Sequence, residues 1–318
     1  MIRTATQLKA KVRNLSGSDS QKAQTLIRNF IMERFLERIA LSKYRNNFIL
    51  KGGMLVAAVV GLDTRATLDI DTTIKSINLS KEKAERIVNE IIAVDIDDGM
   101  RFQISRITDI MEEHEYPGIR IVLDSTLENL RQTVKIDIST GDVITPGAIE
   151  YSYRLMFEDR AISLWAYNIE TLLAEKLETI LARGTANTRM RDFYDIHIIT
   201  NQFNFSHDVF RKAFIATSTK RGTSDLILDL NDIIHNIGTD QTMIRMWEGY
   251  RINSFYVGEL PWNVVMTAVK KLAGIIVPGN LSKEQLDAEI QKGYDDMLEG
   301  RTEPAKQVFE EIRKDYGF

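Results

Sequence analysis

The amino-acid sequence predicts an α/β protein of the α+β type, with a mixed sheet flanked by helices in residues 1–165 and a mainly helical half in residues 166–318. Two observations support this prediction. Short runs that alternate apolar and polar residues, typical of strands, recur up to residue 167. From Asn168 onward, apolar residues recur at helical spacing instead. We therefore place the boundary between an α/β domain and a helical domain near residue 165.

The bulk composition is that of an ordinary globular protein. The chain has 318 residues, of which 44% are hydrophobic and 27% charged, enough for one large domain or two modest ones. It has no cysteine, which excludes disulfides, thiol catalysis and thiolate metal sites. No apolar run approaches the ~20 residues needed to cross a bilayer, and the N-terminus lacks the apolar core of a secretory signal. We expect a cytoplasmic protein without a membrane partner.

The net charge of -4 argues against a protein that coats nucleic acid without specificity. A local basic patch that binds a structured RNA remains compatible with it.

In the first half, apolar stripes at helical spacing predict helices over residues 20–41, 53–61 and 81–93. Ser18, Asp19 and Ser80 precede two of these stripes and suit helix N-caps. Strand-like runs cover residues 68–74, 102–107, 119–124, 133–139 and 161–167, and Phe48-Ile49-Leu50 is a shorter apolar run. The acidic segment 112–117 is typical of a hairpin connection.

In the second half, helical periodicity begins at Asn168 and predicts a succession of helices. They are expected over residues 168–180, 191–200, 224–235, 239–249 and 261–274, with others after residue 207 and from residue 282 to the end.

The most informative stretch joins a glycine pair, Gly52 and Gly53, to two aspartates, Asp69 and Asp71. Alternation along a strand places both aspartates on one face, with α-carbons roughly 7 Å apart. Adjacent carboxylates repel each other in a dry site, and a magnesium ion held by carboxylates and substrate phosphates removes that cost. Glycines let the backbone approach a phosphate closely. The alternative is a turn followed by an edge strand with solvated acids.

A third carboxylate is predicted on a neighbouring strand. In Val134-Lys135-Ile136-Asp137-Ile138, alternation puts Lys135 and Asp137 on one face. A third acid beside the pair would let the site hold two metal ions, which can activate a hydroxyl and steady a leaving oxygen. The alternative is a half-buried strand with a surface lysine and aspartate.

Two polar positions on the predicted helices also suit phosphate chemistry. Lys176 stands at the edge of an apolar stripe, where it would act as a point charge on a triphosphate or merely snorkel to solvent. Asp192 follows Arg191 in a first helical turn, and Arg191 and Asp195, four residues apart, suit a pair along the helix. The basic loop 183–189 precedes them and is a plausible place to meet phosphates.

Taken together and in this order, these stretches resemble the AbiEii/AbiGii toxin family of bacterial nucleotidyltransferases, part of the polymerase-beta-like superfamily. The matching residues are Leu50-Lys51-Gly52-Gly53, Arg65, Thr67, Asp69-Ile70-Asp71, Lys135-Ile136-Asp137, Ala174-Glu175-Lys176-Leu177 and Arg191-Asp192-Phe193-Tyr194-Asp195. The resemblance covers roughly residues 45–200, and it implies a polymerase-beta-like core. Two departures stand out. Gly53 replaces a serine found in much of the superfamily, which removes a hydroxyl, and the distance along the chain to Asp69 is longer than usual.

The resemblance implies roles for single residues. Asp69, Asp71, Lys176 and Asp192 would be catalytic, and Asp69, Asp71 and Asp137 would bind metal. Lys176 would contact the triphosphate. The resemblance and the residue pattern together predict that the nucleotide is bound by Gly52, Gly53, Arg65, Thr67, Lys176 and Arg191. Lys135 is a further candidate for phosphate contact.

The resemblance also implies a function. Such proteins are toxins of type IV toxin–antitoxin or abortive-infection systems that act in phage defence. They use a nucleoside triphosphate with Mg²⁺, or alternatively Mn²⁺, and some add nucleotides to the 3′ end of tRNA, which blocks translation. Their antitoxin is a co-encoded DNA-binding repressor that acts without an obligatory direct complex. Two rival functions remain: transfer of a nucleotide or phosphate to a protein side chain, and a non-catalytic nucleotide- or RNA-binding module.

Overall fold

The computed structural model describes residues 1–110 and 118–276. The helices are α1 (Ala5–Ser16), α2 (Ser20–Leu41), α3 (Gly52–Val60), α4 (Lys81–Ile92), α5 (Ile169–Arg183), α6 (Met190–Gln202), α7 (His207–Lys220), α8 (Leu230–Thr239), α9 (Gln241–Ile252) and α10 (Trp262–Ala273). The strands are β1 (Phe48–Lys51), β2 (Asp69–Ile74), β3 (Met100–Ile110), β4 (Gly118–Leu127), β5 (Leu130–Thr140), β6 (Ile149–Arg154) and β7 (Ala161–Ala166). Two short 3₁₀ helices cover Gly184–Ala186 and Ser224–Ile227.

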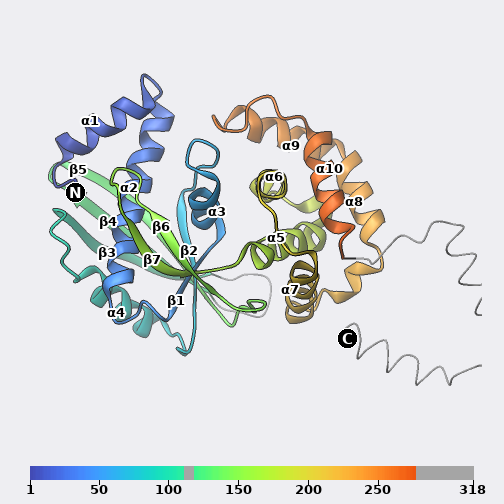
Figure 1. The fold of residues 1–318 in the computed structure, drawn as a ribbon, viewed down its shortest axis with the longest axis horizontal. Helices are drawn as coiled ribbons and strands as arrows, with labels where there is room; N and C mark the ends of the chain where they lie inside the picture. The colour runs from blue at the N-terminus through green and yellow to red at the C-terminus, as the bar shows by residue number, and fades with distance from the viewer. Residues whose placement is uncertain (111–117, 277–318) are drawn as a thin grey trace, which may run out of the picture. The chain divides into compact units, whose positions relative to one another are not determined.

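The strands form one mixed sheet in the order β3-β4-β5-β2-β1-β7-β6 (Figure 1). β2 runs antiparallel to β1 and parallel to β5, and β1 runs parallel to β7. The remaining neighbours pair antiparallel. This arrangement confirms the predicted mixed sheet flanked by helices, and it places β2 and β5 side by side near the centre.

One face of the sheet forms the main apolar core. Alternate residues of β4 and β5, such as Ile121, Leu123 and Ile136, are fully buried. α2 packs against β5 and β7, and α4 packs against β3 and α2. The caps expected from the sequence form, since Asp19 accepts a hydrogen bond from the Lys22 amide and begins α2, and Ser80 caps α4 in the same way.

The helical half begins directly after the sheet. Asn168 caps α5 by accepting a hydrogen bond from the Thr171 amide at 2.7 Å. α5 packs against α6 and α7, and α6 also contacts α3 of the strand-bearing half. Residues Met1–Leu272 form one compact unit, and the division near residue 165 stays a prediction.

Some elements differ from the expectations. α1 and β6 were not expected, and the single helix expected over residues 224–235 is instead a short 3₁₀ helix followed by α8. Leu228, which lies between these two helices, is 86% exposed. The hairpin connection at 112–117 and the helix from residue 282 lie outside the described residues. Among the described helices, none combines the length and the apolar character of a membrane span.

Candidate active site

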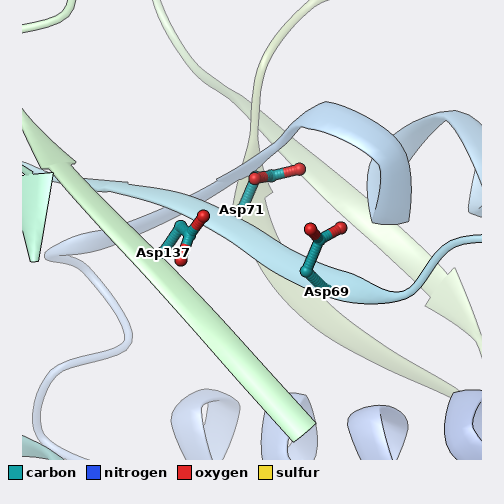
Figure 2. Close-up of side chains that lie close together, drawn as sticks. All are labelled: Asp69, Asp71 and Asp137. Carbon is teal, nitrogen blue, oxygen red and sulfur yellow. The ribbon is translucent and has the colours of Figure 1, made fainter. Parts of the chain in front are cut away.

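Three aspartates from two adjacent strands share one small space. Asp69 and Asp71 come from β2 and Asp137 comes from β5, with Asp71 paired directly to Asp137 in the strand register. Each offers a carboxylate oxygen that lies within 4.8 Å of the other two. Figure 2 shows the three side chains on the same side of their strands. The period of two along a strand therefore brings together the three acids singled out in the sequence.

The glycine pair makes room for this cluster. Gly52 has a φ of +61°, which L side chains rarely adopt, and a Cβ built there would lie 2.1 Å from Asp71 Oδ2. The Gly53 amide donates a hydrogen bond to the same Oδ2 atom at 3.1 Å. A Cβ at Gly53 would lie 2.6 Å from Thr67 Oγ1. The close approach that requires glycine here is thus to Asp71 and Thr67, and contact with a phosphate stays a prediction.

The electrostatics of the cluster favour a cation. Burial and the charge of Asp69 raise the pKa of Asp71 to about 6, against the lowering effect of the Gly53 amide. Arg120 offsets part of the repulsion with two hydrogen bonds to Asp137, at 2.8 and 2.6 Å. Asp69 and Asp71 have no comparable cation within hydrogen-bonding distance among the described residues. Three hard carboxylate ligands on a half-buried surface fit a divalent ion.

Lys176 lies buried between two aspartates of α6. Its Nζ atom is 2.7 Å from Asp192 Oδ1 and 2.7 Å from Asp195 Oδ2. Burial alone lowers the pKa of an amine, but the two carboxylates outweigh it, and the pKa of Lys176 lies above its usual value. The ammonium group therefore stays charged at the wall of the site.

Asp195 also holds Arg65, which the sequence assigned to phosphate contact. Arg65 Nε is 2.6 Å from Asp195 Oδ1, and both side chains are almost fully buried. The local pair between Arg191 and Asp195 is therefore replaced by long-range pairs to Arg65 and Lys176. Asp195 is absent from the predicted site residues, although it ends the Arg-Asp-Phe-Tyr-Asp stretch that carries the resemblance.

A cavity of about 550 Å³ opens beside the carboxylates and is lined from both halves of the chain. Nine of the ten predicted site residues line it, and the tenth, Thr67, packs against Gly53 instead. Lys135, which pairs with Asp69 in the β2–β5 register, is not part of the lining. Arg183, Arg189 and Arg191 also line it, and none of the three has an ion pair within the described part of the chain.

A second polar cluster in the same cavity escaped sequence reasoning. Lys51 Nζ lies 2.5 Å from Asp142 Oδ2 and 4.0 Å from Glu175 Oε1. Arg221 approaches Glu175 at 3.4 Å, and Tyr167 donates to Asp142 at 2.9 Å. These residues are far apart in the sequence and follow no local period. The only available signal was the position of Lys51 and Glu175 inside the matching stretches.

An acidic cluster on a mixed sheet, facing a cavity rich in arginine and lysine, is an arrangement suited to enzymes that transfer phosphate-containing groups. Residues 34–311 match the family model described as nucleotidyl transferase AbiEii toxin, type IV TA system. The chain therefore belongs to this family of nucleotidyltransferases. No curated protein matches the chain.

Solved structures that resemble this one include two from different organisms. JHP933 from Helicobacter pylori has 16% sequence identity and a TM-score of 0.46, over 87% of this chain and 98% of that chain. An antigenic nucleotidyltransferase-like protein from Paracoccidioides brasiliensis has 12% identity and a TM-score of 0.35, over 73% of this chain and 94% of that chain.

Family membership has direct consequences. The substrate of a nucleotidyltransferase is a nucleoside triphosphate, its chemistry usually uses a divalent metal ion, and a toxin of a toxin–antitoxin system has an antitoxin. The cluster of Asp69, Asp71 and Asp137 is suited to hold such an ion.

Proposed function

We propose that this toxin is a Mg²⁺-dependent enzyme that moves a nucleoside monophosphate from a nucleoside triphosphate to an RNA acceptor, the 3′ end of a tRNA. The observation that supports it most is the convergence of three carboxylates within 4.8 Å beside a cavity that also offers arginines without an ion pair in the described ranges. Carboxylates to hold a metal ion and cations to receive phosphates are the two elements that this reaction requires.

Asp69, Asp71 and Asp137 would hold the metal through their carboxylate oxygens. Mg²⁺ suits this set because it prefers hard oxygen ligands and commonly takes one or two carboxylates together with substrate phosphates; Mn²⁺ accepts the same ligands. When bound, the ion supplies charge neutralisation and polarises the phosphoryl oxygens. The Gly53 amide keeps Asp71 oriented toward this space through its hydrogen bond.

The cations of the cavity divide into two groups. Lys176 is already bound to Asp192 and Asp195, so a phosphate would have to share or displace Asp192 to reach it. Arg183, Arg189 and Arg191 carry no ion pair among the described residues and are free to receive the triphosphate. We therefore assign the first contact with the β- and γ-phosphates to these arginines, with Lys176 completing the set.

In the proposed step, the RNA 3′-hydroxyl oxygen attacks the α-phosphorus in line. A bond forms between that oxygen and the phosphorus, and the bond from the phosphorus to the bridging oxygen breaks. Pyrophosphate leaves with the electron pair, and the hydroxyl proton passes to solvent. The protein contributes position and fixed charge, since no side chain forms a covalent intermediate.

The biological consequence follows from the acceptor. A tRNA whose 3′ end carries extra nucleotides cannot be aminoacylated, so translation in the cytoplasm stops. Growth arrest of this kind serves phage defence by abortive infection. The antitoxin is proposed to be a separate co-encoded DNA-binding repressor that needs no stable complex with this chain.

The test separates RNA from protein acceptors. Purified protein is incubated with each nucleoside triphosphate labelled at the α-phosphate, in Mg²⁺, with total tRNA and bacterial protein as separate acceptors. We expect label on tRNA, at its 3′ end. Label on protein alone would favour the rival acceptor, and label on neither, with every nucleotide, would favour a binding module.

A further inference from the structure

The outer three strands of the sheet present an open polar face next to the carboxylate cluster. In β4 and β5 the alternate positions on this face are mostly exposed or half-buried, whereas the opposite positions are mostly buried against the core. In β3 a register shift between Ile104 and Arg106 brings Arg101 and Arg106, five positions apart, to the same face. The register fixes which side chains share a row across the three strands. We call this surface the sheet face, and its charged residues outside the carboxylate cluster are Arg101, Arg106, Arg120, Asp124, Arg131 and Lys135.

The sheet face is basic although the whole chain is acidic. Arg101, Arg106, Arg131 and Lys135 are exposed, and none has an ion pair among the residues that the structure describes. The single acid outside the cluster, Asp124, accepts a hydrogen bond from Thr133 at 3.0 Å. An excess of unpaired cations on one open face favours a polyanionic partner.

The four cations form two pairs that flank β4. Arg106 and Lys135 both pair with Val122, and Arg101 and Arg131 both pair with Thr126. Members of a pair are two strand spacings apart, roughly 10 Å, and the two pairs lie four residues apart along β4, roughly 13 Å. A single polynucleotide strand that runs along β4 would thus pass between Arg106 and Lys135 at Val122, and between Arg101 and Arg131 at Thr126.

This track ends at the carboxylate cluster. Lys135 lies opposite Asp69 in the β2–β5 register, in the same row as Arg106. One step further along β5, roughly 7 Å away, Asp137 lies opposite Asp71. The neighbouring strands can be followed in Figure 1. The three arginines that we assign to the triphosphate belong instead to the helical half, in α5, α6 and the loop between them.

We propose that the sheet face binds the sugar-phosphate backbone of the acceptor RNA and leads its 3′ end to Asp69 and Asp71. This assignment rests on the proposed function, because it supplies the acceptor side of that reaction. Arginine and lysine contacts to phosphates position a nucleic acid without reading its bases. The acceptor therefore enters over β3–β5, and the nucleoside triphosphate is held from the opposite side by the helical half.

The test uses two charge-reversed double variants of the full chain, Arg106→Glu/Lys135→Glu and Arg101→Glu/Arg131→Glu. The matched control is Arg154→Glu, which reverses an exposed arginine on β6, at the other edge of the sheet, that has no ion pair in the described ranges. Binding of a fluorescein-labelled 12-nucleotide RNA of mixed sequence is measured by fluorescence anisotropy at several salt concentrations. Thermal melting shows whether each variant is folded. Binding of a fluorescent nucleoside triphosphate shows whether the nucleotide site in the helical half is intact.

We expect each double variant to weaken RNA binding at least tenfold and to reduce the salt slope by about 0.7 for each phosphate that is no longer neutralised. Nucleotide binding, melting temperature and the control variant should stay close to wild type. RNA binding by the double variants equal to wild type, or an equal loss in Arg154→Glu, would overturn the proposal. A wild-type protein that binds no RNA would also overturn it. Binding of polyglutamate is measured in parallel, and double variants that lose only this binding would indicate an acidic protein partner instead of RNA.

Label transfer to tRNA separates this inference from the proposed function. If wild type binds RNA through the sheet face but transfers no label to it, the proposed reaction fails and the RNA surface stands. If wild type transfers label and both double variants transfer it equally well, the reaction stands and the sheet face is not its acceptor surface.

Discussion

Arg65 and Asp195 lie 130 positions apart in the chain, yet their side chains meet in a buried ion pair, with Nε 2.6 Å from Oδ1. The second oxygen of Asp195 contacts Lys176 Nζ at 2.7 Å. One carboxylate thus ties the loop before β2 to α5 and α6. Its position sets how the cations of the helical half face the acids of the sheet.

Replacing Asp195 should cost both stability and activity. Asp195→Asn leaves Arg65 and Lys176 buried without their shared counter-charge, and removal of one partner from a buried pair costs about 3–5 kcal/mol. Urea denaturation measures this loss. Asp192→Asn is the matched control, because Asp192 contacts Lys176 but not Arg65. It should lower stability by less than Asp195→Asn does, because Lys176 keeps Asp195 as a counter-charge, and it should lower transfer by about a hundredfold. Equal stability losses in both variants would contradict a special role for Asp195.

Arg120 should influence how strongly the protein responds to a divalent ion. In Arg120→Gln, Asp137 loses its two hydrogen bonds from the guanidinium, and repulsion within the carboxylate cluster rises. We expect a stability loss of up to ~1 kcal/mol without metal, because Arg120 is partly exposed. The rise in melting temperature on adding Mg²⁺ should be larger than in wild type. Unchanged responses to Mg²⁺ in this variant would argue against an ion bound at Asp137.

Glu33 should make the protein less stable as the pH rises. Burial raises the pKa of this carboxyl group to about 8, although the Met156 amide and Arg34 act in the opposite direction. The folded state then holds a proton that the unfolded chain releases near pH 4.5. Between these values the free energy of unfolding falls as pH rises, on the order of 1 kcal/mol per pH unit.

The comparison of wild type with Glu33→Gln isolates this effect. The amide cannot ionise, so its unfolding free energy, measured in urea from pH 5 to pH 8, should fall less steeply than that of wild type. Parallel curves for the two proteins would show that Glu33 is ionised in the folded state.

Gly52 should tolerate no side chain. Alanine at this position combines a φ of +61° with a Cβ only 2.1 Å from Asp71 Oδ2, so Asp71 must move. Gly17→Ala is a suitable control, because Gly17 has a φ of +58° and no neighbour within 4 Å. Both variants should lose about 1–2 kcal/mol from backbone strain, but only Gly52→Ala should lose nucleotide transfer. An active Gly52→Ala enzyme would show that the position of Asp71 is unimportant.

Local periodicity predicted which acids share a strand face, and the pairing of β2 with β5 then brings them into one cluster. Asp69 with Asp71, and Lys135 with Asp137, share a face because the side-chain period of a strand is two, and β2 and β5 then pair with these positions in register. The apolar stripe of α2 and its Asp19 cap were equally visible, since helix formation there depends on neighbours in the sequence.

Features that depend on distant residues were not predictable. Asp195 has a local candidate partner in Arg191, but burial against Arg65 and Lys176 decides its ion pairs. The edge strand β6 is an exception, because Ile149, Tyr151 and Tyr153 alternate with polar residues and this local pattern does indicate a strand. The need for glycine at position 52 arises from Asp71, which follows almost 20 residues later and reaches it only through the pairing of β1 with β2.

The central claim is that Asp69 and Asp71 hold the divalent ion on which nucleotide transfer depends. The most direct measurement is the rate at which Asp69→Asn and Asp71→Asn transfer α-labelled nucleotide to tRNA in Mg²⁺, compared with wild type. The melting temperature of each variant shows whether it is folded like wild type. We expect each variant to lose at least a thousandfold in rate, and wild type to lose activity in the same way when EDTA removes the metal. A folded variant that transfers label at the wild-type rate would contradict the claim.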